Sequence, residues 1–433
     1  MTRRGPGRSR GDRRAVRTLI ACAALNHAAF AGSRVVVSLA ALQLSASPFA
    51  IGLILSFYSL LPMFLSVAGG RWIDRVGMRL PMLGGTALLA FGVAVPALAW
   101  DVAGLFLAAV TMGLGFMAQH LCTQKAVGEL GGERGRVTNF ALLSLGFSIS
   151  GFTGPTGAGL LIDLVGHRAT FVLLALAPVL AALGLWSFWR RRRRATLGPV
   201  RRAETAAGRA PGGSAGTGAD PGPLTAPGGS VLDLMREPEL KRLYVAVAML
   251  SSAWDVHQFL VPLYGAKLGL SASLIGLVLG SFAAATFIVR LALPLLARKV
   301  SEWPLIMFAM AVATGVYAVY PFFPTLAPML VLSFVLGLGL GVAQPMVLSQ
   351  LHRVSPAGRI GEAAGLRLTL VNATQTFLPT AFGAVGGVLG LAPMFWGMAA
   401  LIAAGAAYAR RSGGQGRQGG AGGDLRDDGS GPL

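Results

Sequence analysis

The chain contains twelve long apolar runs, and this feature constrains its fold more than any other. The runs lie at about 18–44, 48–69, 80–100, 103–124, 138–162, 168–189, 242–265, 271–294, 303–322, 325–349, 361–388 and 391–409. Each is close to the ~20 residues that a helix needs to cross the hydrocarbon core of a bilayer. The strands of a membrane barrel would be about ten residues long and would alternate in polarity. Backbone groups in lipid must be satisfied within the segment. The sequence therefore predicts an all-α membrane protein with twelve transmembrane helices.

Composition and charge support lipid as the solvent. Only 12% of the residues are charged, whereas soluble domains carry about 25%. The net charge of +20 is of the kind that nucleic-acid-binding proteins show. Here, however, the arginines lie at the ends of apolar runs, so we expect a bilayer and no nucleic acid as partner. Cys22 and Cys122 fall inside apolar runs, where they are expected to be free, small hydrophobic residues.

The runs divide the chain into two six-helix bundles with polar connections. We expect a disordered basic arm over 1–17, one bundle over 18–190 and a second bundle over 237–411. Residues 191–236 are rich in Gly, Pro, Ala and Arg and predict a flexible linker, and the Gly-rich residues 412–433 predict a disordered tail.

Charge placement predicts the orientation in the membrane. Of the 37 Lys and Arg residues, 32 lie in the arm, the tail and the loops that follow even-numbered runs, whereas the opposite loops hold only Arg168 and Lys267. By the positive-inside rule, both termini and the linker are expected to be cytoplasmic. Four lysines against 33 arginines, with abundant Ala and Gly, are typical of a GC-rich bacterial coding bias. The expected location is therefore a bacterial inner membrane.

The two halves are related by an internal duplication. Shifting the chain by 224 residues places 51–55 on 275–279 and Pro155 on Pro379. Parallel repeats of this kind place the substrate site at the interface of the halves, near the bilayer midplane.

The loop between the second and third runs contains Gly70-x-x-x-Asp74-Arg75-x-Gly77-x-Arg79. This motif resembles the helix 2–3 signature of the major facilitator superfamily. The resemblance implies two pseudo-symmetric bundles and a role for Asp74 in gating. In the family, this carboxylate stabilises the outward-facing state at the start of the eleventh helix, where the helix dipole favours an anion. Gly70 and Gly77 would permit close backbone approach and a tight turn. The alternative is that the arginines only anchor the loop at lipid headgroups.

Two residues depart from the family pattern. Met78 stands where a second basic residue is common, and Ala109 replaces an arginine that many proton-coupled members carry in the fourth helix. The usual charge relay from the loop to the fourth helix is therefore in doubt.

The fifth run contains Gly154, Pro155, Gly157 and Gly159, which resemble the Gly-Pro signature of antiporters in the family, although Ser150 stands where that motif usually has glycine. The alternative is that these residues serve only close helix packing and a proline kink.

Charged residues inside the runs are candidates for the site, because a charge at mid-membrane costs at least about 2.5–3.5 kcal/mol. His27 and Arg34 are seven residues apart in the first run and share a helix face. The resemblance implies that the first, fourth, seventh and tenth helices line a central cavity. The 224-residue shift places Arg34 and Asp255 within about one turn, or ~5 Å, of each other in depth. We expect them to face each other across the cavity and to bind substrate or a proton. A fixed ion pair between the halves is the alternative.

Further polar residues complete the predicted substrate and proton site: Gln119, Gln258, Gln344, Arg367 and Asn372. Arg367 is expected either to attract an anionic substrate or to pair with Glu362. Arg290 is expected to snorkel toward the headgroups. His257 lies about 200° around the helix from Asp255 and is expected to be packed or hydrogen-bonded instead of facing the cavity.

These features favour a secondary active transporter that exports a small organic solute by proton-coupled alternating access, as a monomer without a cofactor. No Gly-x4-Gly-Lys-Ser/Thr loop is present to bind ATP as a direct energy source. An importer or facilitator of an organic anion is the alternative within transport. A membrane sensor or enzyme is the alternative outside it, but no two histidines share a metal-ligand spacing and no nucleophile elbow occurs.

Overall fold

The predicted all-helical architecture is confirmed. The computed structural model describes residues 10–130, 132–206, 231–296, 301–356 and 359–418, which are almost entirely helical. The α-helices are α1 (Arg10–Gln43), α2 (Pro48–Val76), α3 (Arg79–Leu98), α4 (Val102–Glu129), α5 (Gly132–Ala206), α6 (Pro238–Lys267), α7 (Ala272–Leu296), α8 (Glu302–Val319), α9 (Leu326–Val354), α10 (Ile360–Leu389) and α11 (Leu391–Gln418). Short 3₁₀ helices cover Val231–Met235 and Tyr320–Phe322.

These helices supply twelve spans. By length and hydropathy, nine helical segments of the described chain can cross a membrane, and one of them, Asn139–Arg191, lies in α5. The backbone of α5 bends at Gly166, where φ is +79°, so this helix contains two spans. The more polar helices α6 and α10 complete the twelve.

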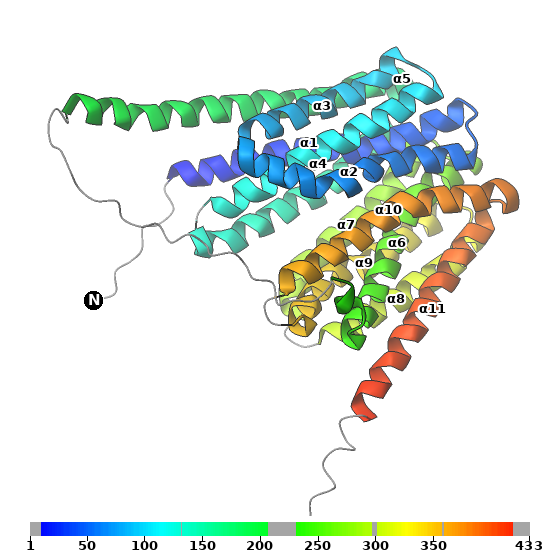
Figure 1. Ribbon diagram of the computed structural model, residues 1–433. Coiled ribbons are helices and arrows are strands. Elements are labelled where there is room, and N and C mark those ends of the chain that lie inside the picture. Colours follow the sequence, from blue (N-terminus) through cyan, green and yellow to red (C-terminus); the bar gives the residue numbers. More distant parts are fainter. Residues whose placement is uncertain (1–9, 131, 207–230, 297–300, 357–358, 419–433) are drawn as a thin grey trace, which may run out of the picture.

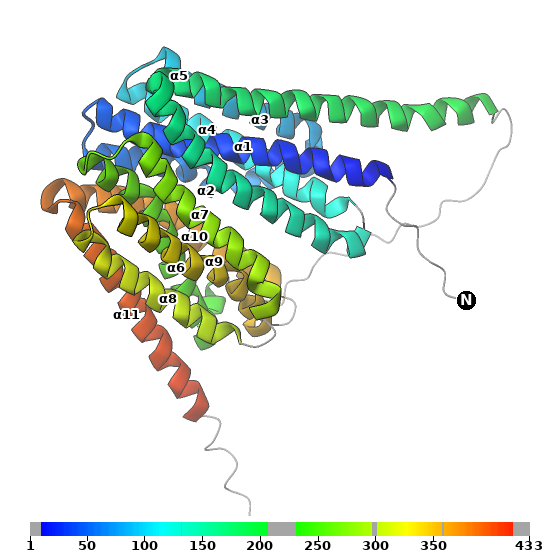
Figure 2. The ribbon, with the colours of Figure 1, turned by 180° about the vertical axis from the view of Figure 1, so that it is seen from behind.

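The spans form two bundles, α1–α5 and α6–α11, that converge at one end and diverge toward the other (Figures 1 and 2). We call the end that holds the loops 44–47, 99–101 and 268–271 the turn end, and the end at which α1 begins and α11 ends the basic end.

Helix starts at the turn end follow from capping residues. Ser47 accepts a hydrogen bond of 3.2 Å from the backbone N–H of Ala50, and Pro48 occupies the first position of α2. Asp101 accepts a hydrogen bond of 2.6 Å from the backbone N–H of Gly104 and begins α4 in the same way.

Two helix crossings join the bundles at the turn end. In the α2–α10 crossing, Gly52 lies so close to Pro379 that a Cβ atom would clash with the proline carbonyl. In the α5–α7 crossing, Gly276 lies in the same way against Pro155. The two contacts are related by the 224-residue shift found in the sequence, so the duplication extends to the interface itself.

Several predicted segment boundaries are wrong within the described residues. Helix α1 begins at Arg10 instead of residue 18, because its apolar face continues to Val16, which is buried. Helix α5 continues to Ala206, past the predicted end of the bundle at 190, through Arg and Ala residues that favour helix. Helix α11 continues to Gln418, beyond the predicted boundary at 411. The remaining parts of the predicted arm, linker and tail, 1–9, 207–230 and 419–433, lie outside the described residues.

Candidate functional site

A cavity of about 1000 Å³ lies between the two bundles. Its wall includes residues from the middle of α1 and α6 and from the parts of α4, α5, α7 and α9 nearer the basic end. The α2–α10 and α5–α7 crossings close the interface at the turn end. The cavity therefore extends from the middle of the molecule toward the basic end.

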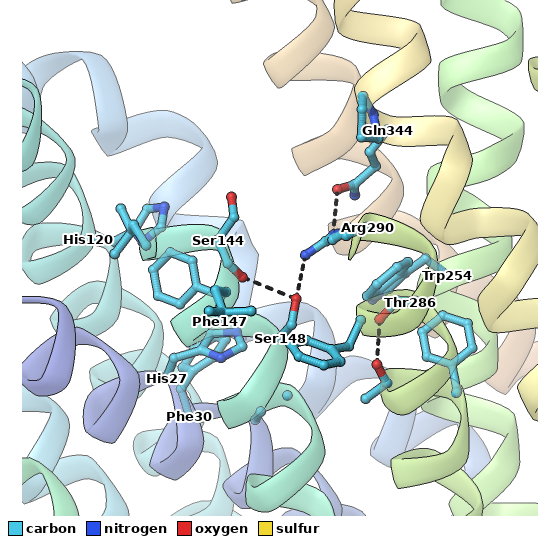
Figure 3. A pocket seen from close by; sticks show the side chains of 18 of the residues that line it. His27, Phe30, His120, Ser144, Phe147, Ser148, Trp254, Thr286, Arg290 and Gln344 are labelled. Atoms are coloured by element: carbon cyan, nitrogen blue, oxygen red, sulfur yellow. Dashed lines mark hydrogen bonds between the residues drawn. The ribbon is translucent and has the colours of Figure 1, made fainter. Parts of the chain in front are cut away.

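Aromatic side chains form the wall on the α1–α5 side (Figure 3). Phe30 stacks on Phe116 with 4.1 Å between ring centroids, and Phe116 stacks on His120 at 5.3 Å. His27 lies 4.9 Å from the ring of Phe147. We call these five residues the aromatic cluster.

His27, one of the predicted site residues, lines the cavity and is held in place by α5. Its Nδ1 shares a hydrogen bond of 2.7 Å with Ser150 Oγ. Ser150 is the position at which the sequence departs from the family's glycine. The serine at this position therefore has a hydrogen-bond partner in α1.

The α6–α11 side presents Trp254 and Phe282, whose rings meet edge to face at 4.6 Å. His257 stacks on Phe282, with 4.6 Å between the ring centroids. Its Nε2 shares a hydrogen bond of 3.0 Å with Ser333 Oγ. His257 is buried and does not line the cavity, which agrees with the packed role predicted for it.

Arg290 connects the two bundles across the cavity (Figure 3). Its Nη1 donates a hydrogen bond of 3.0 Å to Ser148 Oγ on α5, and its Nη2 donates one of 3.4 Å to Gln344 Oε1 on α9. The predicted snorkelling of Arg290 toward headgroups is therefore wrong, because neutral acceptors inside the cavity hold its guanidinium.

Arg34 lines the cavity, whereas Asp255 does not. The guanidinium of Arg34 lies over the ring of Tyr58 at 5.9 Å from the centroid, and its buried Nε atom has no hydrogen-bond partner among the described residues. Asp255 is only 1% exposed and accepts one long hydrogen bond of 3.4 Å from Thr374 on α10.

Arg34 in α1 and Asp255 in α6 carry opposite charges. Within the described chain, however, no ion pair of 4.0 Å or less includes Asp255. The alternative fixed ion pair is therefore not formed in this conformation, and the binding of substrate or a proton between the two residues stays a prediction.

The other predicted site residues divide into two groups. Gln258 and Gln344 line the cavity. Gln119, Arg367 and Asn372 are not among its lining residues. Gln119 is buried and donates a hydrogen bond of 2.8 Å to Thr123 one turn along its own helix, so this amide is already satisfied. The side chain of Glu362, the alternative partner of Arg367, lies outside the described part of the structure.

The loop motif forms the turn between α2 and α3. Gly77 has φ of +83°, which glycine adopts without strain, and its backbone N–H donates a hydrogen bond of 2.9 Å to Ile73. The predicted tight turn is confirmed at Gly77. A Cβ atom at Gly70 would meet no atom of the described residues within 4 Å, so among them the predicted close approach is not formed in this conformation.

The charged members of the motif show no gating contact in the described residues. Arg75 is exposed and Arg79 is half-buried. The side chains of Asp74 and of residues 360–362 at the start of α10 lie outside the described part. Ala109, which replaces the arginine of the fourth helix, is fully buried in the apolar core.

The glycines of the α5 motif have distinct neighbours. Gly154 lies against the backbone of Ala28 in α1, and Gly159 lies against that of Ala272 in α7, so a Cβ atom at either would clash. At Gly157 a Cβ atom would meet nothing within 4 Å. Pro155 belongs to the α5–α7 crossing. The motif therefore packs α5 against α1 of its own bundle and against α7 of the other bundle.

Sequence reasoning missed two further contacts between the bundles. Ser148 was not singled out, because a serine in an apolar helix is common. Asp163 lies before the bend of α5, and its carboxylate accepts hydrogen bonds from the backbone N–H groups of Ala272 and Ser273, at 3.1 and 2.8 Å. It thereby caps the start of α7. A lone acid at the end of an apolar run was the signal that could have identified it.

Comparisons with known proteins agree with this architecture. The family model described as Major Facilitator Superfamily matches residues 19–379. One similar solved structure is a POT family transporter in complex with a thioalcohol-conjugated peptide, with a TM-score of 0.73 and 14% identity over 93% of this chain and 96% of that one. Another is a bacterial homologue of the human lysosomal transporter Spinster in an inward-facing, unoccupied conformation, with a TM-score of 0.73 and 13% identity over 94% and 98% of the two chains.

A curated relative matches over a shorter stretch. The probable vesicular acetylcholine transporter-B of Danio rerio is 29% identical over 134 residues, which make up 29% of this chain and 26% of that protein. The match thus spans about a quarter of the relative's length. The family model, in contrast, covers both bundles. The chain belongs to the major facilitator superfamily and is a membrane solute transporter, not an enzyme.

Proposed function

We propose that this chain is a secondary active transporter that moves a small organic solute by alternating access, with protons as the coupling ion and export as the direction. The observation that carries this proposal is the cavity between the two bundles, which is closed at the turn end by two equivalent crossings and extends toward the basic end. A rocking motion of one bundle against the other would move the opening to the opposite side.

The charge distribution supports an assignment of the two ends. Because 32 of the 37 Lys and Arg residues lie, by sequence, in the terminal segments and in the connections that follow even-numbered runs, the positive-inside rule favours the basic end as cytoplasmic. The conformation described here is then inward-open, both termini are cytoplasmic, and the turn end is periplasmic in a bacterial inner membrane.

Proton coupling is assigned to Asp255 together with Arg34. An ionised carboxylate that is 1% exposed and has one long hydrogen bond is costly unless a cation or a proton compensates it. Arg34 is the candidate cation, and within the described chain it forms no ion pair of 4.0 Å or less with Asp255 in this conformation. Alternation between a proton on Asp255 and a closer contact with Arg34 would couple proton movement to rocking.

The loop motif belongs to the other conformation in this scheme. Closure of the basic end would bring the turn at Gly77 toward the start of α10, where Asp74 would meet the positive end of a helix dipole. Gly70, which is open in the present conformation, would then permit the close approach. Anchoring of the loop by its arginines at the headgroups remains the competing role.

Export is favoured by the resemblance of the α5 motif to the Gly-Pro signature of the family's antiporters, while the packing of Gly154 and Gly159 against α1 and α7 also fits a purely structural role of the motif. The second candidate function is import or facilitated diffusion of an organic anion. It is favoured by a cavity wall that contains Arg34 and Arg290 but no acidic residue among its described members.

The test begins with a substrate screen on a deletion strain. The purified full chain is then reconstituted in liposomes, and movement of the identified solute is measured with and without an imposed pH gradient. Gradient-driven movement that leads out of the cytoplasmic side supports the proposal. Equal rates with and without a gradient favour the facilitator, and no movement by the reconstituted chain contradicts both.

A further inference from the structure

We infer that the solute is an organic anion with a flat apolar body, and that its anionic group binds Arg290 while its body lies against the aromatic cluster. This inference rests on the proposed transport function and names its class of substrate. The residues involved are Arg290, Ser148 and the aromatic cluster. Of these, only His27 was among the predicted site residues.

The charge balance of Arg290 supports an anionic ligand. Its guanidinium lies in the cavity wall, and both of its hydrogen-bond acceptors, Ser148 Oγ and Gln344 Oε1, are neutral. Within the described chain, no acidic side chain forms an ion pair with it. An arginine inside a membrane protein normally has a compensating charge, and a carboxylate can accept two parallel hydrogen bonds from one guanidinium. The missing negative charge is therefore one that a solute would supply.

Arg34 is a weaker candidate for this role. Its guanidinium already lies over the ring of Tyr58, 5.9 Å from the ring centroid, so an aromatic face of the protein interacts with its charge. Arg34 also lies closer to the turn end than Arg290 does, and so farther from the basic end toward which the cavity extends. Arg34 is nine residues before the end of α1, or about 14 Å from the turn end along the helix. Arg290 is 18 residues after the start of α7, or about 27 Å from that end.

The aromatic cluster lies at a depth similar to that of Arg290. His27 is 16 residues before the end of α1, which corresponds to about 24 Å from the turn end. Figure 3 shows His27, Phe147 and His120 on the side of Ser148 opposite Arg290. A solute that replaces Ser148 as the partner of Arg290 would have its body beside these rings.

The shape and chemistry of the cluster favour a flat ring. Phe30 and Phe116 are stacked at 4.1 Å, and aromatic pairs of this kind contribute beyond the apolar area that they bury. The imidazoles of His27 and His120 extend the ring surface, and both are in contact with Phe147. An aliphatic anion would use the charge of Arg290 but not this surface.

A hydrogen bond between Arg290 and Ser148 could also serve only as a tether between the bundles. The two roles predict different effects of charge. A tether requires a donor at 290 and an acceptor at 148, regardless of the ligand. An anion site requires the positive charge at 290 and distinguishes ligands of one shape by their charge.

The experiment uses three probes of one shape and measures their binding to the purified full chain in detergent by isothermal titration calorimetry. The probes are 2-naphthoate, the neutral 2-naphthalenemethanol and the cationic 2-(aminomethyl)naphthalene. The inference predicts that the naphthoate binds at least ~10-fold more tightly than the alcohol and that the amine binds most weakly, because a hydrogen bond to a charged group is worth about 10- to 100-fold in affinity.

Variants connect this preference to the site. Arg290→Gln should weaken naphthoate binding by about 10- to 100-fold and leave alcohol binding unchanged, whereas Ser148→Ala should leave the preference for the anion intact. Arg168→Gln is the matched control, because Arg168 lies over Trp100 at 5.4 Å, away from the cavity. Circular dichroism and gel filtration verify that each variant is folded.

Three results would overturn the inference: wild-type protein that does not bind the naphthoate, wild-type protein that binds the alcohol or the amine as tightly, and an Arg290→Gln variant that loses the two ligands equally. Because binding is measured at equilibrium without a membrane gradient, each of these results leaves the transport assay of the proposed function independent.

Discussion

The carboxylate of Asp163, in the first arm of α5, accepts a hydrogen bond of 2.8 Å from the backbone N–H of Ser273, the second residue of α7. The two residues belong to different bundles, so this helix cap also fastens the turn end. A capping aspartate satisfies backbone donors that the helix itself leaves free and lies at the positive end of the helix dipole.

Replacement of this cap should loosen the turn end. Asp163→Ala should cost the closed turn end about 0.5–2 kcal/mol, which corresponds to a shift of up to about 30-fold in the ratio of closed to open molecules. Spin labels at Leu98 and Phe322, exposed residues on opposite bundles at this end, would report it as a longer distance in double electron–electron resonance. The native Cys22 and Cys122 would first be changed to alanine.

Asp101→Ala provides the matched control. Asp101 caps α4 with the same chemistry at the same end, but its acceptor contact stays within one bundle. Asp101→Ala should lower the free energy of unfolding without altering the distance between the labels at Leu98 and Phe322. If both variants lengthen the distance equally, the cap of Asp163 has no particular role in closure.

The glycine contacts of the crossings should be equally sensitive. Gly52→Ala would place a Cβ atom against the carbonyl of Pro379, and overpacking of this kind typically costs about 1–3 kcal/mol. The expected result is a turn end that closes poorly, a longer distance between labels at Leu98 and Phe322, and slower transport. Gly84→Ala is the control, because a Cβ atom there meets nothing within 4 Å. An unchanged label distance in Gly52→Ala would contradict the importance of the crossing.

The two glycines of the loop motif should respond differently. Gly77→Ala forces alanine to a φ of +83° with ψ of 165°, a region almost restricted to glycine, and should destabilise the folded protein by about 1–3 kcal/mol, which a lower Tm in detergent would show. Gly70→Ala should not lower Tm, because no described atom lies within 4 Å of the added Cβ and alanine favours the helix more than glycine does. If closure of the basic end requires close approach at Gly70, transport by Gly70→Ala should still be slower. Transport by Gly70→Ala at the wild-type rate would show that closure of the basic end does not require close approach at Gly70.

Neutralisation of Asp255 tests proton coupling. Asp255→Asn should reduce solute accumulation under a pH gradient to the level without one, because the amide cannot bind and release a proton. Exchange of labelled for unlabelled solute at equal pH should persist, since exchange needs no net proton movement. Thr374→Val is the control for loss of the 3.4 Å hydrogen bond alone. Gradient-driven accumulation that survives in Asp255→Asn would exclude this carboxylate as the coupling group.

The helices and their duplication could be predicted from the sequence because both depend on composition along the chain. A run of about 20 apolar residues has few alternatives to a membrane helix. The 224-residue shift that places Pro155 on Pro379 also relates the contacts Gly276–Pro155 and Gly52–Pro379. Boundaries were less predictable, since α1 begins at Arg10, within a polar segment that precedes the buried Val16.

The site was harder to predict because it depends on helix rotation. Arg34 and His27 share a face in the sequence, and both line the cavity. Gln119 was an equally good candidate by composition, but it bonds to Thr123 in its own helix. Arg290 was assigned to the headgroups from its position near a helix end, and no pattern in the sequence places Ser148 opposite it. Contacts between helices distant in the chain decide these cases.

The equivalence of the two crossings has a consequence for leakage. The two crossings lie on different helix pairs, so weakening one of them widens the turn end, whereas full separation of the bundles there requires both to separate in the same molecule. If the two separate independently, the frequency of full separation is the product of two small probabilities. Individually weak contacts can then hold back an ion gradient, and neither has to be strong enough to prevent the transporter from turning over.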